Sequence, residues 1–441
     1  MASEWPNTTI GEHVDLITGE AFQSALFETA PSDGVRLARG DNVKEGGFEW
    51  GEKSRFWPEL TPDLERYLLS EGDVLLGMDG SKVGKNWVRV RREDLPCLLV
   101  QRVARLRSKP TLHQRFLRYL IGNPMFRDYV GRVRTGTSIP HISGGQIKSY
   151  EFRLPPLADQ RAIASVLGAL DDKIDLNRRM CQTLEEMARA LFKSWFVDFD
   201  PVRAKMEGRD PGLPKEIADL FPSRLIDSEL GPIPEGWRVT TVAELCSSIS
   251  SGGTPQRMTQ QYWNGGKIPW FKTGELFDRP LIDSEEKVTE LALANSACKL
   301  WPEGTILFAL YASPTVGRMG VLTQPGTSNQ AAAGLIVLPA IGVPFMLNAL
   351  YFARAKLQQI AVGAAQQNIN QGVLKGHRIV VPNSELAGYF SGMMKPALDR
   401  QASLDRQSDT LAALRDTLLP KLISGELRVP ASLGSMQEVA P

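Results

Sequence analysis

The sequence contains few of the residues that build metal centres, disulfide frameworks or membrane spans. It has four cysteines and four histidines in 441 residues, and all of them lie far apart. None has the short spacing of a zinc site or a redox pair, so we expect no metal ion and reduced thiols. No basic and then apolar leader opens the chain, and prolines interrupt its most apolar stretch, residues 334–353. We therefore expect a cytoplasmic protein that does not cross a membrane.

Motifs for nucleotide binding and catalysis are also missing. The stretch from Gly80 to Lys85 resembles a phosphate-binding loop, but it has three residues between its glycines instead of four, and Asn86 stands where Ser or Thr would follow. Residues 283–287 contain an acidic-x-Lys element like that of a metal nuclease, without a second acidic residue at a useful distance. There is no glycine-rich dinucleotide fingerprint and no Asn/Asp-Pro-Pro-aromatic motif of an amino-methyltransferase. We therefore expect a binding protein with no catalytic residue, metal or cofactor of its own.

Residues 160–196 have the spacing of one long amphipathic helix. Alternating steps of four and three residues give a seam of ten positions, of which nine are apolar or carry a thiol. At 1.5 Å per residue this helix is roughly 55 Å long, and a rod of that length needs a partner along it. The seam consists of Ile163, Leu167, Leu170, Ile174, Asn177, Cys181, Leu184, Ala188, Leu191 and Trp195.

The partner that we predict lies near the other end of the sequence. Moving each seam position by 227 residues gives a second, more polar seam, and a polar residue facing Asn177 would fix the register of the two helices. The alternative is an ordinary amphipathic helix on a globular core. The second seam consists of Phe390, Met394, Ala397, Gln401, Leu404, Ser408, Leu411, Arg415, Leu418 and Leu422, with Leu398 and Leu414 beside it.

The regions before the two rods repeat as well. Trp5-Pro-Asn-Thr-Thr-Ile-Gly-Glu returns as Trp237-Arg-Val-Thr-Thr-Val-Ala-Glu. Glu71-Gly-Asp-Val-Leu-Leu returns as Glu303-Gly-Thr-Ile-Leu-Phe, and Val83-Gly-Lys returns as Val316-Gly-Arg. Similarity in the same order along both halves indicates a duplication with a period far too long for a solenoid. The sequence therefore predicts a globular domain, a rod, a second globular domain and a second rod.

Each globular half has strand-like runs beside helical spacing, which favours an α/β or α+β domain with a mixed sheet. In the first half we expect strands at 34–38, 73–78, 87–90 and 98–106 and a helix at 112–130; in the second, a buried strand at 335–338 and a helix from Phe345. Residues 200–236 hold six prolines, so we expect no helix there. The predicted boundaries are 1–153 and 237–383 for the globular domains, 154–199 and 384–425 for the long helices, 200–236 for a Pro/Gly-rich linker and 426–441 for a flexible tail.

Charge is distributed unevenly along a chain that is nearly neutral overall. Residues 1–81 hold 6 basic and 16 acidic residues, whereas residues 82–148 hold 15 basic and 3 acidic ones. In the second half, residues 304–383 hold 5 basic residues and no acidic one. A solvated face explains one such segment, but the same excess in both repeats is typical of a surface that binds a polyanion.

The polar residues in these segments favour nucleic acid as that polyanion. Arg, Gln and Asn can bond to base edges in the major groove, whereas Lys and Arg also bind phosphates without reading sequence. A polar capped loop is the alternative for the Gln/Asn cluster. The candidates for base contacts are Arg132, Arg134, Thr137, Ser138, His141, Gln366, Gln367, Asn368, Asn370 and Gln371. The candidates for phosphate contacts are Lys82, Lys85, Lys148, Arg318 and Lys375.

With these features, nearly the whole chain resembles the specificity subunits of Type I restriction–modification systems. The most specific segments flank the rods: Leu154-Pro-Pro-Leu-Ala-Asp-Gln-Arg, Leu191-Phe-Lys-Ser-Trp-Phe-Val-Asp-Phe-Asp-Pro and Leu419-Pro-Lys-Leu-Ile-Ser-Gly-Glu-Leu. The sequence departs from the pattern where Asn383-Ser-Glu-Leu-Ala-Gly replaces the Pro-x-x-Glu-Gln-like start of a rod.

The resemblance implies two target recognition domains separated by an antiparallel coiled coil of two long helices. Each domain would read one half of a bipartite, asymmetric target in double-stranded DNA, with the coiled coil as a spacer. The expected partners are two methyltransferase subunits and the restriction or translocase subunits. These partners, and not this chain, would use S-adenosylmethionine, ATP and Mg²⁺.

Two other functions are weighed against this one. A single-chain nuclease or fused methyltransferase would cleave or methylate DNA by itself. A coiled-coil scaffold that binds only proteins would not retard DNA at moderate salt, even with a methyltransferase partner.

Overall fold

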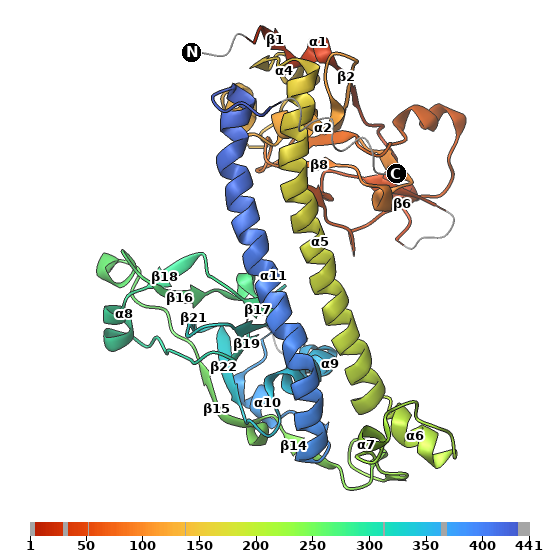
Figure 1. Ribbon diagram of the computed structural model, residues 1–441, viewed down its shortest axis with the longest axis vertical. Coiled ribbons are helices and arrows are strands. Elements are labelled where there is room, and N and C mark those ends of the chain that lie inside the picture. Colours follow the sequence, from red (N-terminus) through yellow and green to blue (C-terminus); the bar gives the residue numbers. More distant parts are fainter. Residues whose placement is uncertain are drawn as a thin grey trace. The chain divides into compact units, whose positions relative to one another are not determined.

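The computed structural model describes residues 5–29, 34–51, 53–136, 138–311, 314–362 and 368–430. The chain divides into two compact units. Unit 1 consists of Met1–Ile174 and Thr410–Pro441, and unit 2 of Asp175–Asp409. Each unit combines a globular lobe with one part of each of two long helices, α5 (Leu157–Phe196) and α11 (Ser384–Ser424) (Figure 1).

The lobe of unit 1 is built on a four-stranded antiparallel sheet with the order β2-β10-β7-β8. A second, three-stranded sheet has the order β6-β3-β9, and β1 pairs with β11. The strands are β1 (Asn7–Thr9), β2 (Val14–Thr18), β3 (Val35–Ala38), β6 (Phe56–Trp57), β7 (Val74–Gly77), β8 (Trp87–Arg89), β9 (Cys97–Leu99), β10 (Val103–Ser108) and β11 (Glu151–Arg153). The short pair β4 (Val43–Lys44) and β5 (Gly47–Phe48) and the helices α1 (Ile10–His13), α2 (Gln114–Ile121), α3 (Pro124–Val133) and α4 (Gly144–Lys148) complete the lobe.

The lobe of unit 2 has the same plan, with one extra strand in its main sheet. Its main sheet has the order β15-β22-β19-β20-β17, its smaller sheet has the order β18-β16-β21, and β14 pairs with β23. The strands are β14 (Arg238–Thr241), β15 (Cys246–Ser251), β16 (Ile268–Phe271), β17 (Arg279–Leu281), β18 (Glu286–Val288), β19 (Ile306–Ala309), β20 (Met319–Leu322), β21 (Thr327–Ser328), β22 (Ala332–Val337) and β23 (Arg378–Val381). The helices are α8 (Glu290–Asn295), α9 (Val343–Val362) and α10 (Gln371–Gly376).

The register of the strands shows that the two lobes repeat one another. Leu75 of β7 lies opposite Arg105 of β10 in unit 1. The equivalent pair in unit 2 is Leu307 of β19, which lies opposite Gly334 of β22. The pairs β1/β11 and β14/β23 also match residue by residue. The predicted two-fold repeat of mixed α/β domains is therefore confirmed.

The repeated Val-Gly-basic motif has a structural cause. Gly84 and Gly317 both have φ +82°, a left-handed conformation that glycine adopts without strain. A Cβ at Gly84 would lie 2.9 Å from the side chain of Val130 in α3, and one at Gly317 would lie 3.0 Å from Arg354 in α9. In both lobes this turn packs directly on a helix, against Val130 in unit 1 and against the longer, flexible side chain of Arg354 in unit 2.

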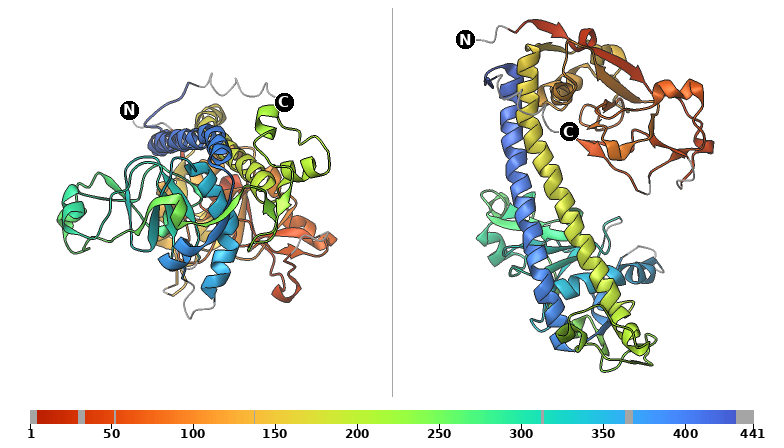
Figure 2. Two further views of the ribbon diagram at one scale, coloured as in Figure 1. Left: turned by 90° about the horizontal axis from the view of Figure 1, so that it is seen from below. Right: turned by 45° about the vertical axis from the view of Figure 1, so that its right-hand side comes forward.

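The two long helices pair in antiparallel fashion within each unit. In unit 1, Arg415 of α11 contacts Asp171 of α5 at 2.8 Å, and Leu167 and Leu422 are buried in one core. In unit 2, the Nδ2 of Asn177 lies 2.9 Å from Oε1 of Gln407, close to Ser408. Figures 1 and 2 show α5 and α11 side by side.

The positions of the two predicted seams are buried or half-buried without exception. Asn177 is 0% exposed, and it meets polar partners on α11. The neighbouring Cys181 and Gln401 bond to each other's helix backbone. Leu398 is half-buried and packs against the unit 2 core, whereas Leu414 is exposed and does not widen the seam.

The expectation that residues 200–236 contain no helix is wrong. They form α6 (Asp200–Met206), α7 (Lys215–Ala218) and the strand pair β12 (Leu225–Ile226) and β13 (Ile233–Pro234). Pro201 lies in the first turn of α6 and Pro214 is the N-cap residue of α7, positions where a missing N–H costs no helical hydrogen bond. The predicted helix at 112–130 is also divided, because α2 ends at Ile121 and α3 begins at Pro124.

Of the predicted tail, residues 426–430 are described and the rest lie outside the described part of the chain. The guanidinium of Arg428 lies 4.8 Å from the ring centroid of Trp5 and 3.6 Å from the carboxylate of Asp159. These contacts hold the first residues after α11 against the lobe of unit 1.

Candidate nucleic-acid interface

The loops of unit 1 that carry the predicted residues meet at one edge of its main sheet. Because neighbouring strands are antiparallel, the ends of β2 and β7 and the beginnings of β8 and β10 lie at the same edge. We call this edge, with residues 20–27, 78–86, 101–102, 134–136 and 138–141, the polar edge of unit 1.

Backbone hydrogen bonds join the two loops that hold most of the candidates. The N–H of Gly80 donates to the carbonyl of Pro140 at 3.0 Å, and the N–H of Ile142 donates to Met78 at 2.9 Å. Thr135 and His141 bond to each other in both directions. The loop with Lys82 and Lys85 therefore lies against the loop with Arg134, Ser138 and His141, so residues distant in sequence share one surface.

A concave surface of about 600 Å³ lies at this edge. Its basic side chains are Arg39, Lys44, Lys82 and Arg102, and its acidic ones are Asp41 and Asp79. Arg39 pairs with Asp41 and Arg102 pairs with Asp79, whereas Lys82 is exposed and forms no ion pair within the described residues. The groove can therefore accept an anionic ligand without first losing an ion pair at Lys82.

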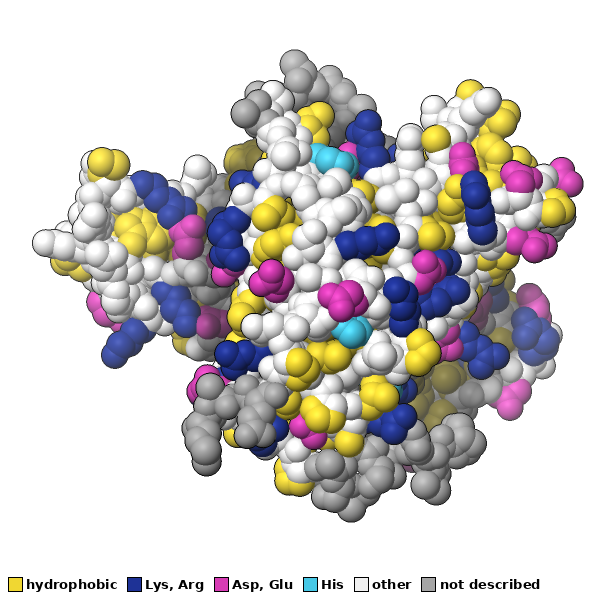
Figure 3. All heavy atoms as spheres, turned by 90° about the horizontal axis from the view of Figure 1, so that it is seen from above, with side chains coloured by type: hydrophobic (Ala, Val, Ile, Leu, Met, Phe, Trp, Pro, Cys, Tyr) yellow, Lys and Arg dark blue, Asp and Glu magenta, His cyan; other side chains and the backbone are white. Residues whose placement is uncertain are grey.

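The charge asymmetry of the sequence is partly neutralised inside the lobe. Four basic residues of 82–148 pair with acidic residues of 1–81, which corrects the interpretation of the whole segment as a free polyanion footprint. Figure 3 shows Lys and Arg interspersed with Asp and Glu on the face that it presents. The pairs are Arg102–Asp79 at 2.9 Å, Arg105–Asp15 at 2.9 Å, Arg107–Asp73 at 2.7 Å and Arg127–Glu45 at 3.7 Å.

The environments of these ion pairs shift the pKa of the basic groups in different directions. The hydrogen bonds that Arg107 donates to the carboxylate of Asp73 raise the pKa of Arg107, whereas burial lowers the pKa of Arg105. Both guanidinium groups serve to hold strand β10 to its neighbours, so they are not available to a ligand. The exposed cations that form no ion pair within the described part of unit 1 include Lys82, Lys85, Arg132, Arg134 and Lys148.

Two of the unit 1 candidates are placed differently from the rest. Lys148 is on α4, where its Cβ lies against Gly11 of α1 rather than on the loop pair described above. Arg132 is in the last turn of α3, just before the loop. Thr137 lies outside the described residues.

Unit 2 has a polar edge at the equivalent place. It consists of residues 252–263, 277–279, 310–311, 314–318, 329–331 and 368–371, which adjoin the end of β15 and β19 and the beginning of β17, β20 and β22. The N–H of Ile369 donates to the carbonyl of Leu310 at 2.9 Å, which is the counterpart of the Ile142–Met78 bond.

The predicted residues of this second edge have structural contacts of their own. Asn370 is the N-cap of α10, and its side chain accepts a hydrogen bond from the N–H of Val373 at 2.8 Å. The amide of Gln371 donates to Ser251 at 3.2 Å, and Asn368 is half-buried. Lys375 is half-buried on α10, while Gln366 and Gln367 lie outside the described residues.

An exposed aromatic ring accompanies Arg318 at this edge. Phe277 is 51% exposed, and the guanidinium groups of Arg318 and Arg279 lie 5.4 Å and 5.5 Å from its ring centroid. The next residue, Asp278, has φ +62° and is held by Arg354 at 2.8 Å. Phe277 was not predicted from the sequence, because its only local signal is its position between an acidic turn and an arginine.

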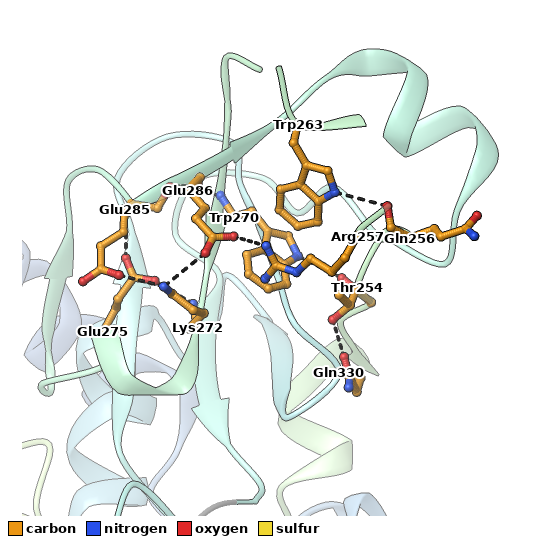
Figure 4. Close-up of polar contacts among 12 residues, drawn as sticks. Thr254, Gln256, Arg257, Trp263, Trp270, Lys272, Glu275, Glu285, Glu286 and Gln330 are labelled. Atoms are coloured by element: carbon orange, nitrogen blue, oxygen red, sulfur yellow. Dashed lines mark hydrogen bonds and ion pairs between the residues drawn. The ribbon is translucent and has the colours of Figure 1, made fainter. Parts of the chain in front are cut away.

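A second group missed from the sequence anchors residues 252–263 (Figure 4). The guanidinium of Arg257 lies 4.0 Å from the ring centroid of Trp263 and 4.7 Å from that of Trp270, and it pairs with Glu286. Lys272 completes the group, with Glu285 at 2.7 Å. The Arg257 hydrogen bond lowers the pKa of Glu286, and Glu285 raises the pKa of Lys272.

This anchor leaves the side chains on either side of Arg257 facing solvent. Met258 is 87% exposed, and Gln256 is exposed beside it. The hydroxyl of Thr254 donates to the amide oxygen of Gln330, which comes from the turn before β22. The interleaving of Arg257 with Trp263 and Trp270 is the signal that could have found this group, because basic and aromatic residues often alternate at nucleic-acid surfaces.

The segment Trp195–Asp200, which includes the last two residues of α5, is mostly internal. Trp195 is buried, with its ring 5.3 Å from Phe221 and 6.2 Å from Phe390. Val197 and Asp200 are the exposed side chains of this segment. A partner at this end of α5 would therefore meet the outer residues and not the tryptophan.

Neither a metal cluster nor a bilayer-spanning helix is found in the described ranges. No group of three or more His, Cys, Asp or Glu side chains there is arranged to hold a metal ion. None of the helices described has the length and apolar character needed to cross a bilayer.

Comparison with known proteins places these observations in a family. Residues 3–186 and 234–386 match the family described as Type I restriction modification DNA specificity domain. The specificity subunit of the Type I restriction enzyme HindI from Haemophilus influenzae is 26% identical over 341 residues, covering 68% of this chain and 73% of the relative. That of MjaIX from Methanocaldococcus jannaschii is 27% identical over 319 residues, covering 71% and 69%.

A solved structure has the same fold. The crystal structure of the Type I restriction–modification S subunit from M. genitalium matches with a TM-score of 0.54 and 17% identity, covering 95% of this chain and 96% of that one. Together with the family match over both repeats, these findings assign the chain. It belongs to the family of Type I restriction–modification DNA specificity proteins, the non-catalytic subunits that recognise DNA in these systems.

Proposed function

We propose that this chain binds a bipartite, asymmetric site in double-stranded DNA, with the polar edge of each unit contacting one half of the site. The observation that carries the proposal is the recurrence of one edge, built by matching strands, with exposed cations and amides in both units. A duplicated reader addresses two separated segments of a duplex, whereas a single protein-binding surface has no need of the second copy.

The residues at the edges divide by chemistry into two kinds of contact. Lys82, Lys85 and Arg318 lie on equivalent loops, between β7 and β8 or between β19 and β20, and are suited to phosphates. Arg134, Ser138 and His141 lie beside the first of these loops and are suited to base edges. Phosphate contacts position the protein, and base contacts give the sequence preference.

The paired helices are proposed to set the distance between the half-sites. Helix α5 has 40 residues, which corresponds to about 60 Å at 1.5 Å per residue. One turn of DNA is 34–36 Å, so helices of this length suit half-sites about a turn apart. The polar contacts of Asn177 with Gln407 and Ser408 hold the register of the pair.

In this proposal the chemistry belongs to the partners. Two methyltransferase subunits would use S-adenosylmethionine, and restriction or translocase subunits would use ATP and Mg²⁺. The exposed sides of α5 and α11, and Val197 and Asp200 after α5, are the surfaces that we assign to these partners. This chain would supply recognition and assembly, in the cytoplasm.

Selection from a randomised duplex library tests the proposal. The full chain, assembled with the modification subunits of its own system, is incubated with the library at moderate salt, and bound duplexes are sequenced. We expect two short preferred segments with an unread spacer of fixed length. Enrichment of one continuous motif, or of no motif, would contradict the proposal, and failure to retain any DNA would favour a protein-binding scaffold.

A further inference from the structure

Two exposed glutamines occupy the same position in the two repeats. Gln101 precedes β10, and Gln330 precedes β22, the equivalent strand, which is likewise second in the order of its main sheet. The turns that carry them close with equivalent hydrogen bonds, from Val103 to Val100 at 3.3 Å and from Ala332 to Asn329 at 3.2 Å. Both side chains are therefore displayed from the same point of the repeated frame.

Their surroundings place both glutamines on the polar edges. Gln101 lines the concave surface of unit 1 together with Lys82 and Arg102. Gln330 lies next to Thr254, in the region of unit 2 that Arg257 anchors (Figure 4). Each polar edge thus combines an exposed amide with cations that can bind the flanking phosphates.

The backbone below each side chain is fixed. The N–H of Gln101 donates to the carbonyl of Glu20 at 2.7 Å, and the N–H of Ala331, next to Gln330, donates to the side chain of Asn329 at 3.2 Å. Both turns lead into buried strands. A reading group on such a turn has a defined position, whereas one on a long loop must be ordered on binding.

The side chains themselves are available to a ligand. Gln101 forms no side-chain hydrogen bond with the described residues of the chain. The amide oxygen of Gln330 accepts one bond from a hydroxyl group, which leaves its NH₂ group to donate. A glutamine amide can donate to N7 and accept from N6–H₂ of adenine in the major groove, which no other base offers in that arrangement.

From this placement and chemistry we infer that Gln101 and Gln330 are specificity-determining residues, each reading an adenine in one half of the DNA site. The inference rests on the proposed function. Gln101 would contact the half-site of unit 1, and Gln330 would contact that of unit 2. The sequence patterns did not single out either residue, because each is a single glutamine, Gln101 directly after an apolar run and Gln330 directly before one.

The test compares single variants in the complete complex with the modification subunits. Library selection is repeated with Gln101→Ala, Gln330→Ala and Gln330→Glu. The matched control is Gln324→Ala, an exposed glutamine that follows β20 at the opposite edge of the same sheet and donates to Ile282 at 2.9 Å. All four changes are on exposed side chains, and thermal melting of each variant checks that it is folded.

We expect each alanine variant to lose its preference for adenine at one position of one half-site, by about tenfold or more. The other half-site should be unchanged. Gln330→Glu should shift the preference at its position towards cytosine, because a carboxylate accepts from the cytosine amino group. Gln324→Ala should select the same sequences as the wild type.

The outcomes separate this inference from the proposed function. If the wild-type complex selects a two-part site and the alanine variants select the identical site, the assignment of the glutamines is wrong and the proposed function stands. If an alanine variant weakens all sequences equally, the glutamine positions the protein and does not read a base, which also overturns the inference. If the wild type selects no two-part site, the proposed function itself fails.

Discussion

The polar edges of units 1 and 2 share a backbone frame and differ in most of the side chains attached to it. Both units share the strands and their register. They also share the left-handed glycine and the backbone hydrogen bond donated by Ile142 in unit 1 and by Ile369 in unit 2. Unit 1 adds a groove lined by Lys82, and Lys85 lies on the same loop after β7. Unit 2 adds strand β17, the exposed Phe277 and the Arg257 anchor.

This difference suggests how one protein fold can read two unlike DNA sequences. The frame is fixed by buried strands and by contacts such as the one between Gly84 and Val130, which tolerate little change. The loops at the edge carry few of the core residues, so they can differ without loss of stability. An asymmetric DNA target follows naturally from two equal frames with unequal edges.

The largest expected effect is on the free energy of unfolding, when a glycine of the backbone frame shared by the two lobes is replaced. Gly84→Ala should lower the free energy of unfolding by about 3 kcal/mol, because it combines a left-handed backbone with a contact to Val130. Gly317→Ala should cost less, about 1–2 kcal/mol, because the flexible side chain of Arg354 can move. Denaturant unfolding of the full chain measures both.

A glycine without neighbours serves as the control for this pair. Gly208 has φ +69° and nothing within 4 Å of an added Cβ, so Gly208→Ala reports the backbone cost alone. If Gly84→Ala and Gly208→Ala destabilise equally, the packing of the turn on α3 is not part of the frame.

The next effect concerns phosphate contacts and distinguishes the two edges. Changing Lys82 and Lys85 to Ala together should reduce the slope of log affinity against log salt by about 2, whereas Arg318→Ala should reduce it by about 1. All base preferences should remain. An unchanged slope for the double variant would remove these lysines from the interface, and salt titrations of binding to one specific duplex provide the measurement.

A smaller effect is expected where the helices pair in unit 2. Asn177 is buried and its Oδ1 has no partner among the described residues, so Asn177→Leu should raise the free energy of unfolding by about 1 kcal/mol. The substitution also removes the polar contacts of Asn177 with α11, so the register should be less defined. A less defined register should broaden the range of spacer lengths in the library selection. A variant that is more stable and keeps a single spacer length would show that Asn177 does not set the register.

The smallest expected effect is the pH dependence of the Arg257 anchor in unit 2. The pKa of Glu286 is lowered in the folded protein, so the contact with Arg257 is complete above the ordinary Glu pKa of 4.5 and is lost as the pH falls through the lower folded value. Fluorescence of Trp263 and Trp270 should change in this acid range. Glu286→Gln should abolish the change, and an identical titration in that variant would contradict the assignment.

Much of the fold could be predicted because its signals are local or periodic. The seam from Ile163 to Trp195 follows from helical spacing, and the repeat follows from motifs such as Val83-Gly-Lys. The buried strand at 335–338 lies within or beside β22, and α9 includes Phe345. The helices in the linker were missed because proline was counted as a breaker, although Pro201 occupies a first-turn position that accepts it.

The candidate site was harder to predict because its contacts are distant in sequence. Arg105 and Asp15 are 90 residues apart, so nothing local shows that this arginine is already paired. Asn370 has the composition of a base reader and the position of a helix cap, and only its contact with Val373 reveals the latter role. The placement of Lys82 beside His141 required the pairing of two loops.

The central claim is that two repeated edges read two halves of one DNA site. Mapping of methylated adenine in the source organism, with and without this chain, tests it most directly. The account predicts that removal of the chain abolishes methylation at a bipartite motif, two short specified segments separated by a fixed unspecified spacer. Loss of methylation at one continuous motif, or no loss at all, would contradict it.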